Sequence, residues 1–421
     1  MARKLSLVAL VFISLILSLE ANPADSVLVI KGGKIFTVTQ GTIDNGYIII
    51  KEGKIQEVGK DLAVPPGARL IEATDDFIFP GFIDAGTNLG TLEFENVEED
   101  DDEAELIVAP HLRIVDAFNP DNHFIPEERD QGVTSALIAP RRGNLLSGQS
   151  AFLHLCGQNT AEMSIKCPAA IHGTLGGVFN ARSKPAMTFP STRMGAAALL
   201  RQTLVDAQAY YSRPREPGEK TVSGDGRSKP EGLTEDPASP LLEALIPVIK
   251  RELPLIIIAN RYDDIMTAMR IAREFNIRLI ISEGAEASRL APQLAAMGVP
   301  VIVRPKSAYR LTVETARAKP ENAALLEQAG VKIAFQTGSV QNLGDLLPAV
   351  QEAIKYGLSP QEALKALTIN AAEIFGVADK VGSMEKGKLA DLVIFSGNPL
   401  TSAAKVKMVI IKGQTLEVTS P

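Results

Sequence analysis

The chain has 421 residues, of which 45% are hydrophobic and 22% are charged, and it carries a net charge of −7. This composition is typical of a globular protein, and the acidic balance gives no support for nucleic-acid binding, which requires a basic surface. The length exceeds that of one small domain and suits a (β/α)8 barrel with a minor domain.

Residues 1–24 have the organisation of a secretory signal peptide, with a short basic start and the apolar run Leu5–Leu19. The run is too short to cross a bilayer comfortably, and we expect cleavage near Ala21 or Ala24. An uncleaved N-terminal anchor is the alternative. The sequence therefore predicts an exported protein, periplasmic or extracellular, with no stable membrane span after signal cleavage.

Both ends of the exported chain are rich in β-branched residues and glycine-centred turns. This composition covers residues 27–58 and returns in residues 387–418, and it is typical of antiparallel hairpins. We predict one small β-sandwich built from both chain ends, residues 25–76 together with 383–421. Residues 77–382 would then form the central domain.

The central domain repeats short apolar runs, each followed by polar residues and an amphipathic segment. Repeated β and α units indicate a parallel sheet with helices outside, in the α/β class. The runs are Val133–Ala139, Leu255–Ala259, Leu279–Ser282, Val299–Val303 and Lys332–Gln336.

Two polar segments interrupt this pattern. Glu93–Glu105 carries nine carboxylates in thirteen residues. It is either a solvated loop or a calcium site, although it lacks the spacing and the glycine of an EF-hand loop. Ser212–Pro240, rich in Pro, Gly and Ser, is either a lid over the barrel mouth or a surface insertion.

The chain contains two cysteines, Cys156 and Cys167. In an oxidising compartment they are a candidate disulfide, and two separate buried thiols are the alternative. Two cysteines alone cannot build a structural zinc site.

The stretch Phe77–Gly90 is apolar, contains a Pro-Gly break and ends in small and polar residues. It is typical of a buried strand that delivers its last side chains to a cavity mouth. Further motifs along the chain are His111–Pro120, Gly132–Thr134, Leu146–Ser150, Ala259–Ile265, Thr368–Gly376 and Gly387–Val393. Together these stretches resemble the amidohydrolase superfamily, most closely its imidazolonepropionase-like branch.

The resemblance implies a (β/α)8 TIM-like barrel with the appended β-sandwich. It also implies metal-dependent hydrolysis of non-peptide C–N bonds, such as those of cyclic amides. In such enzymes zinc or another divalent metal lowers the pKa of a bound water and polarises the carbonyl group. A catalytic metal site needs about three protein ligands and an open position.

The expected metal ligands are four histidines and one aspartate at the ends of barrel strands. Their positions are occupied here by Gly86, Asn88, Ile258, Glu283 and Gly338. Glycine and isoleucine offer no side-chain donor atom, and an amide oxygen is a weak ligand, so only Glu283 would bind a metal well. We therefore predict that the chain has no metal ligand set and no metal cofactor.

The barrel mouth should still be a polar pocket. The resemblance places there Asn88, Glu283, Gln336, Ser339 and His172, the last because Lys166–Gly177 leads to the same face.

The remaining histidines, His111, His123 and His154, are expected to be structural, since no two histidines are paired as H-x-H or H-x-x-x-H. A carboxylate pair of Glu283 with Asp84 is a further candidate, but the resemblance implies that the Asp84 position supports the site.

Two functions are consistent with these residues. The first is a non-catalytic homologue that binds a small molecule or acts as the partner subunit of an intact amidohydrolase. The second is an active hydrolase with a displaced or metal-free site in which Glu283 is the general base. A histidine clustered with Glu283 would favour the second.

Overall fold

The computed structural model describes residues 27–93, 106–177, 189–213, 239–304, 312–401 and 403–418. The predicted signal peptide lies outside these residues, as do most of Glu93–Glu105 and most of Ser212–Pro240. Within the described residues, no helix is long and apolar enough to cross a membrane.

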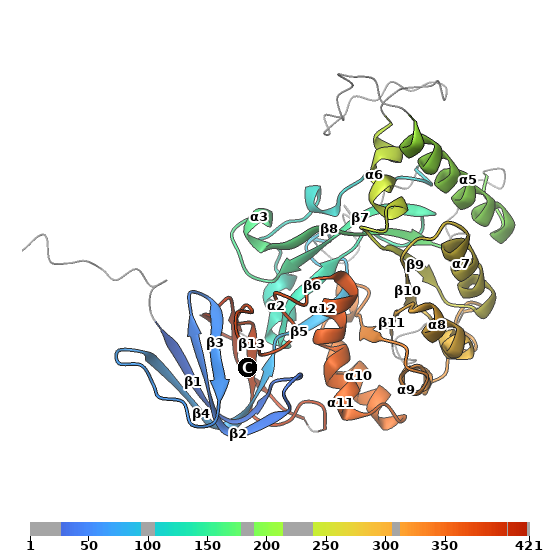
Figure 1. Ribbon diagram of the computed structural model, residues 1–421. Helices are drawn as coiled ribbons and strands as arrows, with labels where there is room; N and C mark the ends of the chain where they lie inside the picture. The colour runs from blue at the N-terminus through green and yellow to red at the C-terminus, as the bar shows by residue number, and fades with distance from the viewer. Residues whose placement is uncertain are drawn as a thin grey trace, which may run out of the picture.

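One lobe of the molecule is a seven-stranded sheet with strands from both chain ends, in the order β15-β14-β13-β4-β1-β2-β3 (Figure 1). β1 pairs with β2 in an antiparallel hairpin and with β4 in parallel. The strands are β1 (Leu28–Phe36), β2 (Thr42–Lys51), β3 (Lys54–Gly59), β4 (Arg69–Pro80), β13 (Leu392–Phe395), β14 (Val406–Ile411) and β15 (Gln414–Leu416).

Inward-facing isoleucines hold this sheet together. Ile30, Ile48 and Ile78 are fully buried in one cluster, as the alternation of a half-buried strand predicts. Gly32 and Gly33 lie inside β1 at a register shift rather than in a turn. Glycine is required at Gly33 because an added Cβ would overlap the backbone of β4.

The second lobe is an eight-stranded barrel, ordered β12-β11-β10-β9-β8-β7-β6-β5. The amide of Gly338, just beyond β12, donates to the carbonyl of Gly86 in β5 at 2.8 Å and so joins the two edges. The strands are β5 (Phe82–Thr87), β6 (Val133–Ile138), β7 (Leu146–His154), β8 (Ser164–Thr174), β9 (Leu255–Ala259), β10 (Leu279–Glu283), β11 (Val301–Val303) and β12 (Ile333–Phe335). The predicted barrel with a sheet from both chain ends is confirmed.

The barrel departs from repeated parallel units at β7, which runs antiparallel to both β6 and β8. The five apolar runs predicted from the sequence correspond to β6 and β9 to β12. β7 and β8 gave no clear pattern because small and polar residues interrupt them and Pro168 lies within β8.

Helices cover the outside of the barrel (Figure 1), and their apolar faces pack into the large core that also contains the outer side of the strands. Ser359 caps α11 by accepting from the amide of Glu362, with Pro360 in the first turn. The helical elements are η2 (Ile114–Asp116), α2 (Phe124–Asp130), α3 (Thr160–Met163), α5 (Arg193–Ser212), α6 (Pro240–Ile249), α7 (Tyr262–Glu274), η3 (Ala287–Leu290), α8 (Ala291–Met297), α9 (Asn322–Gln328), η5 (Val340–Asn342), α10 (Leu346–Lys355), α11 (Pro360–Ala366) and α12 (Ile369–Phe375).

The first chain connection between the two lobes is a single glycine. The stretch predicted as one buried strand is divided at Gly81, with β4 ending at Pro80 and β5 beginning at Phe82. A Cβ at Gly81 would overlap the side chain of Thr134, so no other residue fits without movement. The amide of Gly81 donates to the carbonyl of Asp391 at 2.8 Å, which attaches the returning chain to the same joint.

A buried polar contact also links the lobes. His154 Nε2, at the end of β7, lies 2.9 Å from Asp391 Oδ2, and both side chains are less than 5% exposed. Asp391 Oδ1 accepts from the backbone amide of Lys412 at 2.8 Å. His154 is therefore structural, as predicted from its isolation in the sequence.

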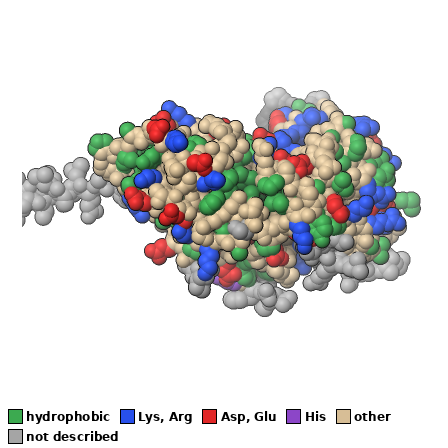
Figure 2. Space-filling model, turned by 90° about the horizontal axis from the view of Figure 1, so that it is seen from below, with side chains coloured by type: hydrophobic (Ala, Val, Ile, Leu, Met, Phe, Trp, Pro, Cys, Tyr) green, Lys and Arg blue, Asp and Glu red, His purple; other side chains and the backbone are tan. Residues whose placement is uncertain are grey.

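The two cysteines are free thiols, with Cys156 half-buried and Cys167 exposed, so the disulfide is not formed and the expectation of two buried thiols is also wrong. On the face shown in Figure 2, acidic and basic side chains are scattered among one another over both lobes. This distribution fits the near balance of charges in the composition.

Candidate functional site

A cavity of about 490 Å³ opens at the carboxyl ends of the barrel strands, where barrel enzymes place their sites. All five predicted ligand positions line it, as do all five predicted pocket residues. Its polar and charged lining comprises Thr87, Asn88, Arg141, Arg142, His172, Asn260, Ser282, Glu283, Arg304, Thr312, Glu314, Thr315, Gln336, Ser339, Gln341 and Asn342.

Glu283 is the buried carboxylate of this cavity. Its backbone has a φ of 69°, a left-handed conformation that a side chain other than glycine rarely adopts. The following Gly284 also has a positive φ, and its amide donates to the carbonyl of Ala259. Backbone strain of this kind persists only where the surroundings hold it.

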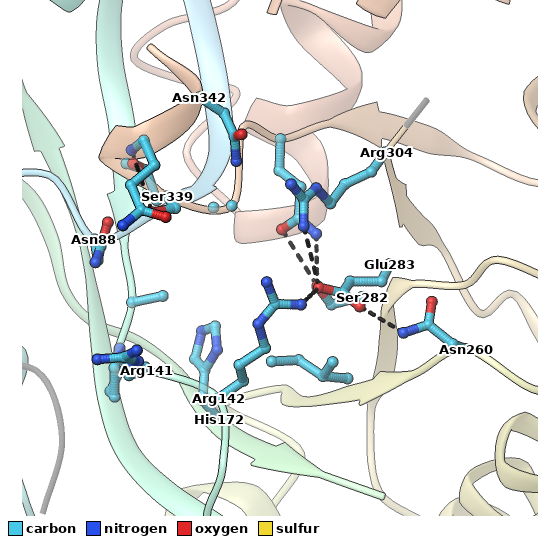
Figure 3. Close-up of a pocket in the computed structure, with 18 of the residues that line it drawn as sticks. Asn88, Arg141, Arg142, His172, Asn260, Ser282, Glu283, Arg304, Ser339 and Asn342 are labelled. Atoms are coloured by element: carbon cyan, nitrogen blue, oxygen red, sulfur yellow. Dashed lines mark hydrogen bonds and ion pairs between the residues drawn. The ribbon is translucent and has the colours of Figure 1, made fainter. Parts of the chain in front are cut away.

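Three side chains fix the Glu283 carboxylate (Figure 3). Arg142 forms an ion pair with Oε1, and Arg304 Nη1 lies 3.5 Å from the same oxygen. Asn260 Nδ2 donates to Oε2 at 2.5 Å, while Asn260 Oδ1 accepts from the amide of Ala285. The Glu283 and Arg304 side chains are both 5% exposed, so this pair is almost fully desolvated, whereas Arg142 is 38% exposed.

Side chains of the protein fill the space that ligands at two of the positions would need. A Cβ added at Gly86 would overlap Oε1 of Gln336, which is held by Ser282 through hydrogen bonds. A Cβ added at Gly338 would lie 3.3 Å from the guanidinium carbon of Arg304. The side chains of Gln336 and Arg304 therefore lie next to the backbone of Gly86 and Gly338, where the side chains of metal ligands would begin.

The expected ligand positions Asn88 and Ile258 offer no free donor atom to a metal, because the first is hydrogen-bonded and the second is apolar. Asn88 Oδ1 accepts from the amide of Val340 at 2.9 Å and so orients η5. Ile258 contributes only hydrocarbon to the cavity. Within the described residues, no group of three or more His, Cys, Asp or Glu side chains could hold a metal ion.

Comparison with known proteins places the chain in a family. An amidohydrolase from Thermotoga maritima of known structure is 30% identical and superposes with a TM-score of 0.83, over 92% of this chain and 99% of that one. The chain belongs to the amidohydrolase superfamily.

Other similarities agree with this assignment. The amidohydrolase family model matches residues 258–416. An imidazolonepropionase of Shouchella clausii is 38% identical over 109 residues, 24% of this chain and 23% of that protein. Adenine deaminase 1 of Latilactobacillus sakei is 24% identical over 93% of this chain and 57% of that protein. The chain thus spans less than two thirds of these curated relatives.

In this amidohydrolase homologue, His172 is the one of the four histidines that lines the cavity. Burial lowers its pKa to about 3, so the imidazole is neutral at physiological pH. His123 is exposed beside Phe124, and His111 is half-buried outside the cavity lining. Lys166 lies at the opposite end of β8, where its ammonium donates to the carbonyl of Phe375.

The arginines of the cavity were missed by the sequence analysis. Arg141 and Arg142 follow β6, and Arg304 follows β11 directly. Both strands were predicted, and residues just past the carboxyl ends of barrel strands point to the mouth. Applying that rule to charged residues as well as to metal ligands would have found all three.

A second ion-pair group borders the cavity through one member, Glu314. Arg193, the first residue of α5, pairs with Asp264 at 2.9 Å and with Glu314 at 2.6 Å. Burial disfavours the charge of Arg193, but the hydrogen bonds to Glu314 and Asp264 raise its pKa overall. Burial raises the pKa of Asp264, against the influence of Arg193.

Asp84 is not part of the cavity lining and is not paired with Glu283. It points to the joint between β5 and the segment after β12, accepting from the amides of Gly86 and Thr337. Burial raises the pKa of Asp84 to about 6. Burial and the nearby charge of Asp84 raise the pKa of Glu128, on α2, to about 8.

These shifted carboxyl groups predict a pH dependence of stability. The folded protein binds the Glu128 proton more tightly than the unfolded chain, so stabilisation is complete below pH 4.5 and is lost as the pH rises through 8. The raised pKa of Asp84 changes stability in the same direction, but its effect is complete near pH 6. We expect Glu128→Gln to remove most of the loss between pH 6 and 8, about 2 kcal/mol in the free energy of unfolding.

Urea unfolding at pH 6, 7 and 8 measures this loss. Glu127→Gln, an exposed neighbour on the same helix, should leave the pH profile of the wild type unchanged. If the free energy of unfolding changed with pH in the same way for Glu128→Gln and the wild type, the raised pKa of Glu128 would be contradicted.

Proposed function

We propose that this protein is a non-catalytic member of the amidohydrolase superfamily whose barrel mouth binds a small molecule. The observation that carries the proposal is the pairing of Glu283 with Arg142 and Arg304 at the place of a metal ligand. The five positions do not fit a divalent metal, because two have no side chain, one is apolar, one is an amide already bound and one is a carboxylate held by arginines.

The same pairing argues against the family's hydrolysis of non-peptide C–N bonds. That chemistry needs a metal-bound water next to the scissile carbonyl. In this cavity two guanidinium groups are directed at the one carboxylate that would bind a metal well. A cation entering between them would meet two like charges in a desolvated space.

An active, metal-free hydrolase is the second candidate, because His172 lines the same cavity as Glu283. A general base must reach the proton that it removes, directly or through one water. The Glu283 oxygens are contacted by Arg142, Arg304 and Asn260, so most of the hydrogen-bonding capacity of the carboxylate is already used. The geometry therefore favours binding over catalysis.

The proposal includes the compartment in which the protein acts. The N-terminal residues have the pattern of a signal peptide, so we place the mature protein outside the cytoplasm, in the periplasm or the medium. A second role as the partner subunit of an intact amidohydrolase is compatible with a binding pocket, and co-purification tests it.

Elemental analysis of the protein, purified without chelator from its own compartment, tests the proposal. We expect far less than one zinc, iron or manganese ion per chain, before and after incubation with excess zinc and gel filtration. About one tightly held metal ion per chain would overturn it. Turnover of a cyclic amide by metal-free protein would overturn it in favour of the second candidate.

A further inference from the structure

A second cavity, of about 660 Å³, opens at the end of the barrel opposite to the mouth. Its lining includes the residue directly before each of β9, β10, β11 and β12, namely Pro254, Arg278, Pro300 and Lys332. These four strands are parallel, so their amino ends meet at one face of the barrel, away from the candidate functional site. We call this cavity the basal groove. Its volume is within the range of pockets for small organic molecules.

The charge of the basal groove is opposite to that of the whole protein. The chain carries a net charge of −7. The charged side chains of the lining are Arg251, Arg273, Arg278, Lys332 and Glu373. Lys332 pairs with Glu373, which leaves the three arginines. Two of them are exposed and Arg278 is half-buried, so a ligand in the groove can reach all three.

Within the described residues, these arginines contact only neutral acceptors. Arg251 Nη1 donates to the carbonyl of Asn276 at 3.0 Å and to its Oδ1 at 2.6 Å. Arg273 Nη2 lies 3.4 Å from the methionine sulfur at the end of α8, and Arg278 Nη1 lies 3.5 Å from the carbonyl of Glu252. Each guanidinium uses one nitrogen in these contacts, so most of its five N–H donors remain for a ligand.

The glutamates that follow two of these arginines in sequence pair with other cations. Glu252 pairs with Lys250 at 2.5 Å, and Glu274 pairs with Arg201 at 2.7 Å. Carboxylates are not scarce in this chain, because 50 acidic residues stand against 43 basic ones. Among the described residues, no ion pair neutralises the three arginines of the basal groove.

Lys166 gives an independent indication of excess positive charge at this end of the barrel. Its ammonium donates at 2.7 Å to the carbonyl of Phe375, the last residue of α12, whose two preceding residues line the groove. Burial and the nearby charges of Arg278 and Lys380 lower the pKa of Lys166, and the opposing carboxylate of Asp379 does not reverse this. The cations beside the groove therefore repel one another.

Two adjacent loops hold two of the arginines in place. Arg251 reaches Asn276 in the loop before β10, and Arg278 reaches back to the loop before β9. Arg251 has a φ of 63° directly after the end of α6, a position at which glycine is usually preferred. Side chains that are already positioned lose less conformational freedom when a ligand binds.

We propose that the basal groove binds a small molecule that carries a phosphate group. The three guanidinium charges match a phosphate dianion, whereas a single carboxylate would balance only one of them. Guanidinium groups also bind phosphate oxygens with paired hydrogen bonds. Ala295, Met297 and Pro300 add half-buried apolar surface for the rest of the ligand. Because the groove is separate from the barrel mouth, this inference does not depend on the proposed function.

Isothermal titration calorimetry of the full chain tests the inference. The probes are inorganic phosphate, phenyl phosphate, benzoate and a hexaglutamate peptide, all at one ionic strength because exposed charges are screened by salt. We expect a phosphate compound to bind with a Kd below about 1 mM and benzoate to bind at least about tenfold more weakly. Tighter binding of phenyl phosphate than of inorganic phosphate would identify an organic phosphate as the ligand, and the reverse order would identify the free ion.

Two arginines on the same helix provide the variant and its matched control. Arg273→Met removes one charge from the groove and should weaken phosphate binding at least about fivefold, whereas Arg273→Lys should weaken it less. Arg270→Met removes one charge three residues away and should leave the affinity unchanged. Arg270 is exposed on α7 and contacts only Thr267 among the described hydrogen bonds. Thermal unfolding confirms that each variant is folded before titration.

The inference is overturned if neither phosphate compound binds with a Kd below about 1 mM. It is also overturned if benzoate or hexaglutamate binds more tightly than both, the latter indicating a surface for an acidic protein segment. Equal affinities of Arg273→Met and Arg270→Met would show that phosphate binds outside the basal groove. None of these results concerns the metal content, so the proposed function stands or fails separately.

Discussion

Glu283→Gln is expected to lower the free energy of unfolding by about 3 kcal/mol. The substitution keeps the size of the side chain but leaves Arg142 and Arg304 facing each other without a carboxylate between them. Arg304 is only 5% exposed and cannot move its charge into water, whereas Arg142 is 38% exposed and relieves part of the repulsion. The expected loss therefore lies near the lower end for a broken buried ion pair.

Urea unfolding at pH 7 measures the effect, with Glu274→Gln as the matched control. Glu274 pairs with Arg201 at the surface, where the two side chains are 47% and 34% exposed. Removing that pair should cost less than about 1 kcal/mol. Equal losses for the two variants would show that the Glu283 pairing is not desolvated, and the structural basis of the binding proposal would fail.

Asp391→Ala is expected to destabilise the protein by about 3 kcal/mol, because it leaves one buried and one half-buried group without a hydrogen-bond partner. One is His154 at the end of β7, and the other is the backbone amide of Lys412 in the turn after β14. Asp391→Asn keeps one acceptor oxygen, so its loss should be about half as large.

The measurement is again the free energy of unfolding in urea, compared with Asp61→Ala at an exposed loop position. That control should change stability by less than about 0.5 kcal/mol. A loss for Asp391→Ala no larger than this would show that the contact between the lobes contributes little.

The sequence predicted the fold where local pattern and tertiary environment agree. The isoleucine-rich strands β9 and β10 are buried on both sides, and their continuous apolar runs reveal this directly. β8 contains Pro168 and β7 contains Gly148, and both are held by their neighbours in the barrel rather than by their own propensity. Pattern reasoning therefore missed these two strands and the reversal of direction at β7.

The candidate site was predicted only in part, for a physical reason. The resemblance to the amidohydrolase superfamily located the positions Gly86, Glu283 and Gly338, because each lies in or beside a short continuous motif. The Glu283 partners Asn260, Arg142 and Arg304 follow β9, β6 and β11, so their pairing with Glu283 depends on the closed barrel and not on residues near it in sequence. The positive φ of Glu283 is likewise a product of its surroundings, which no pattern of residues around it reveals.

The pairing of β4 with both β1 and β13 has a consequence for biosynthesis. β4 ends at Pro80, but its partner β13 begins only at Leu392, so one edge of β4 stays open until the whole barrel and β13 have been made. That edge includes Phe77, Ile78 and Phe79, and an exposed apolar strand edge promotes aggregation. A nascent or truncated chain lacking β13 to β15 would thus expose this edge, and the N-terminal lobe could reach its native form only after these three strands have been made.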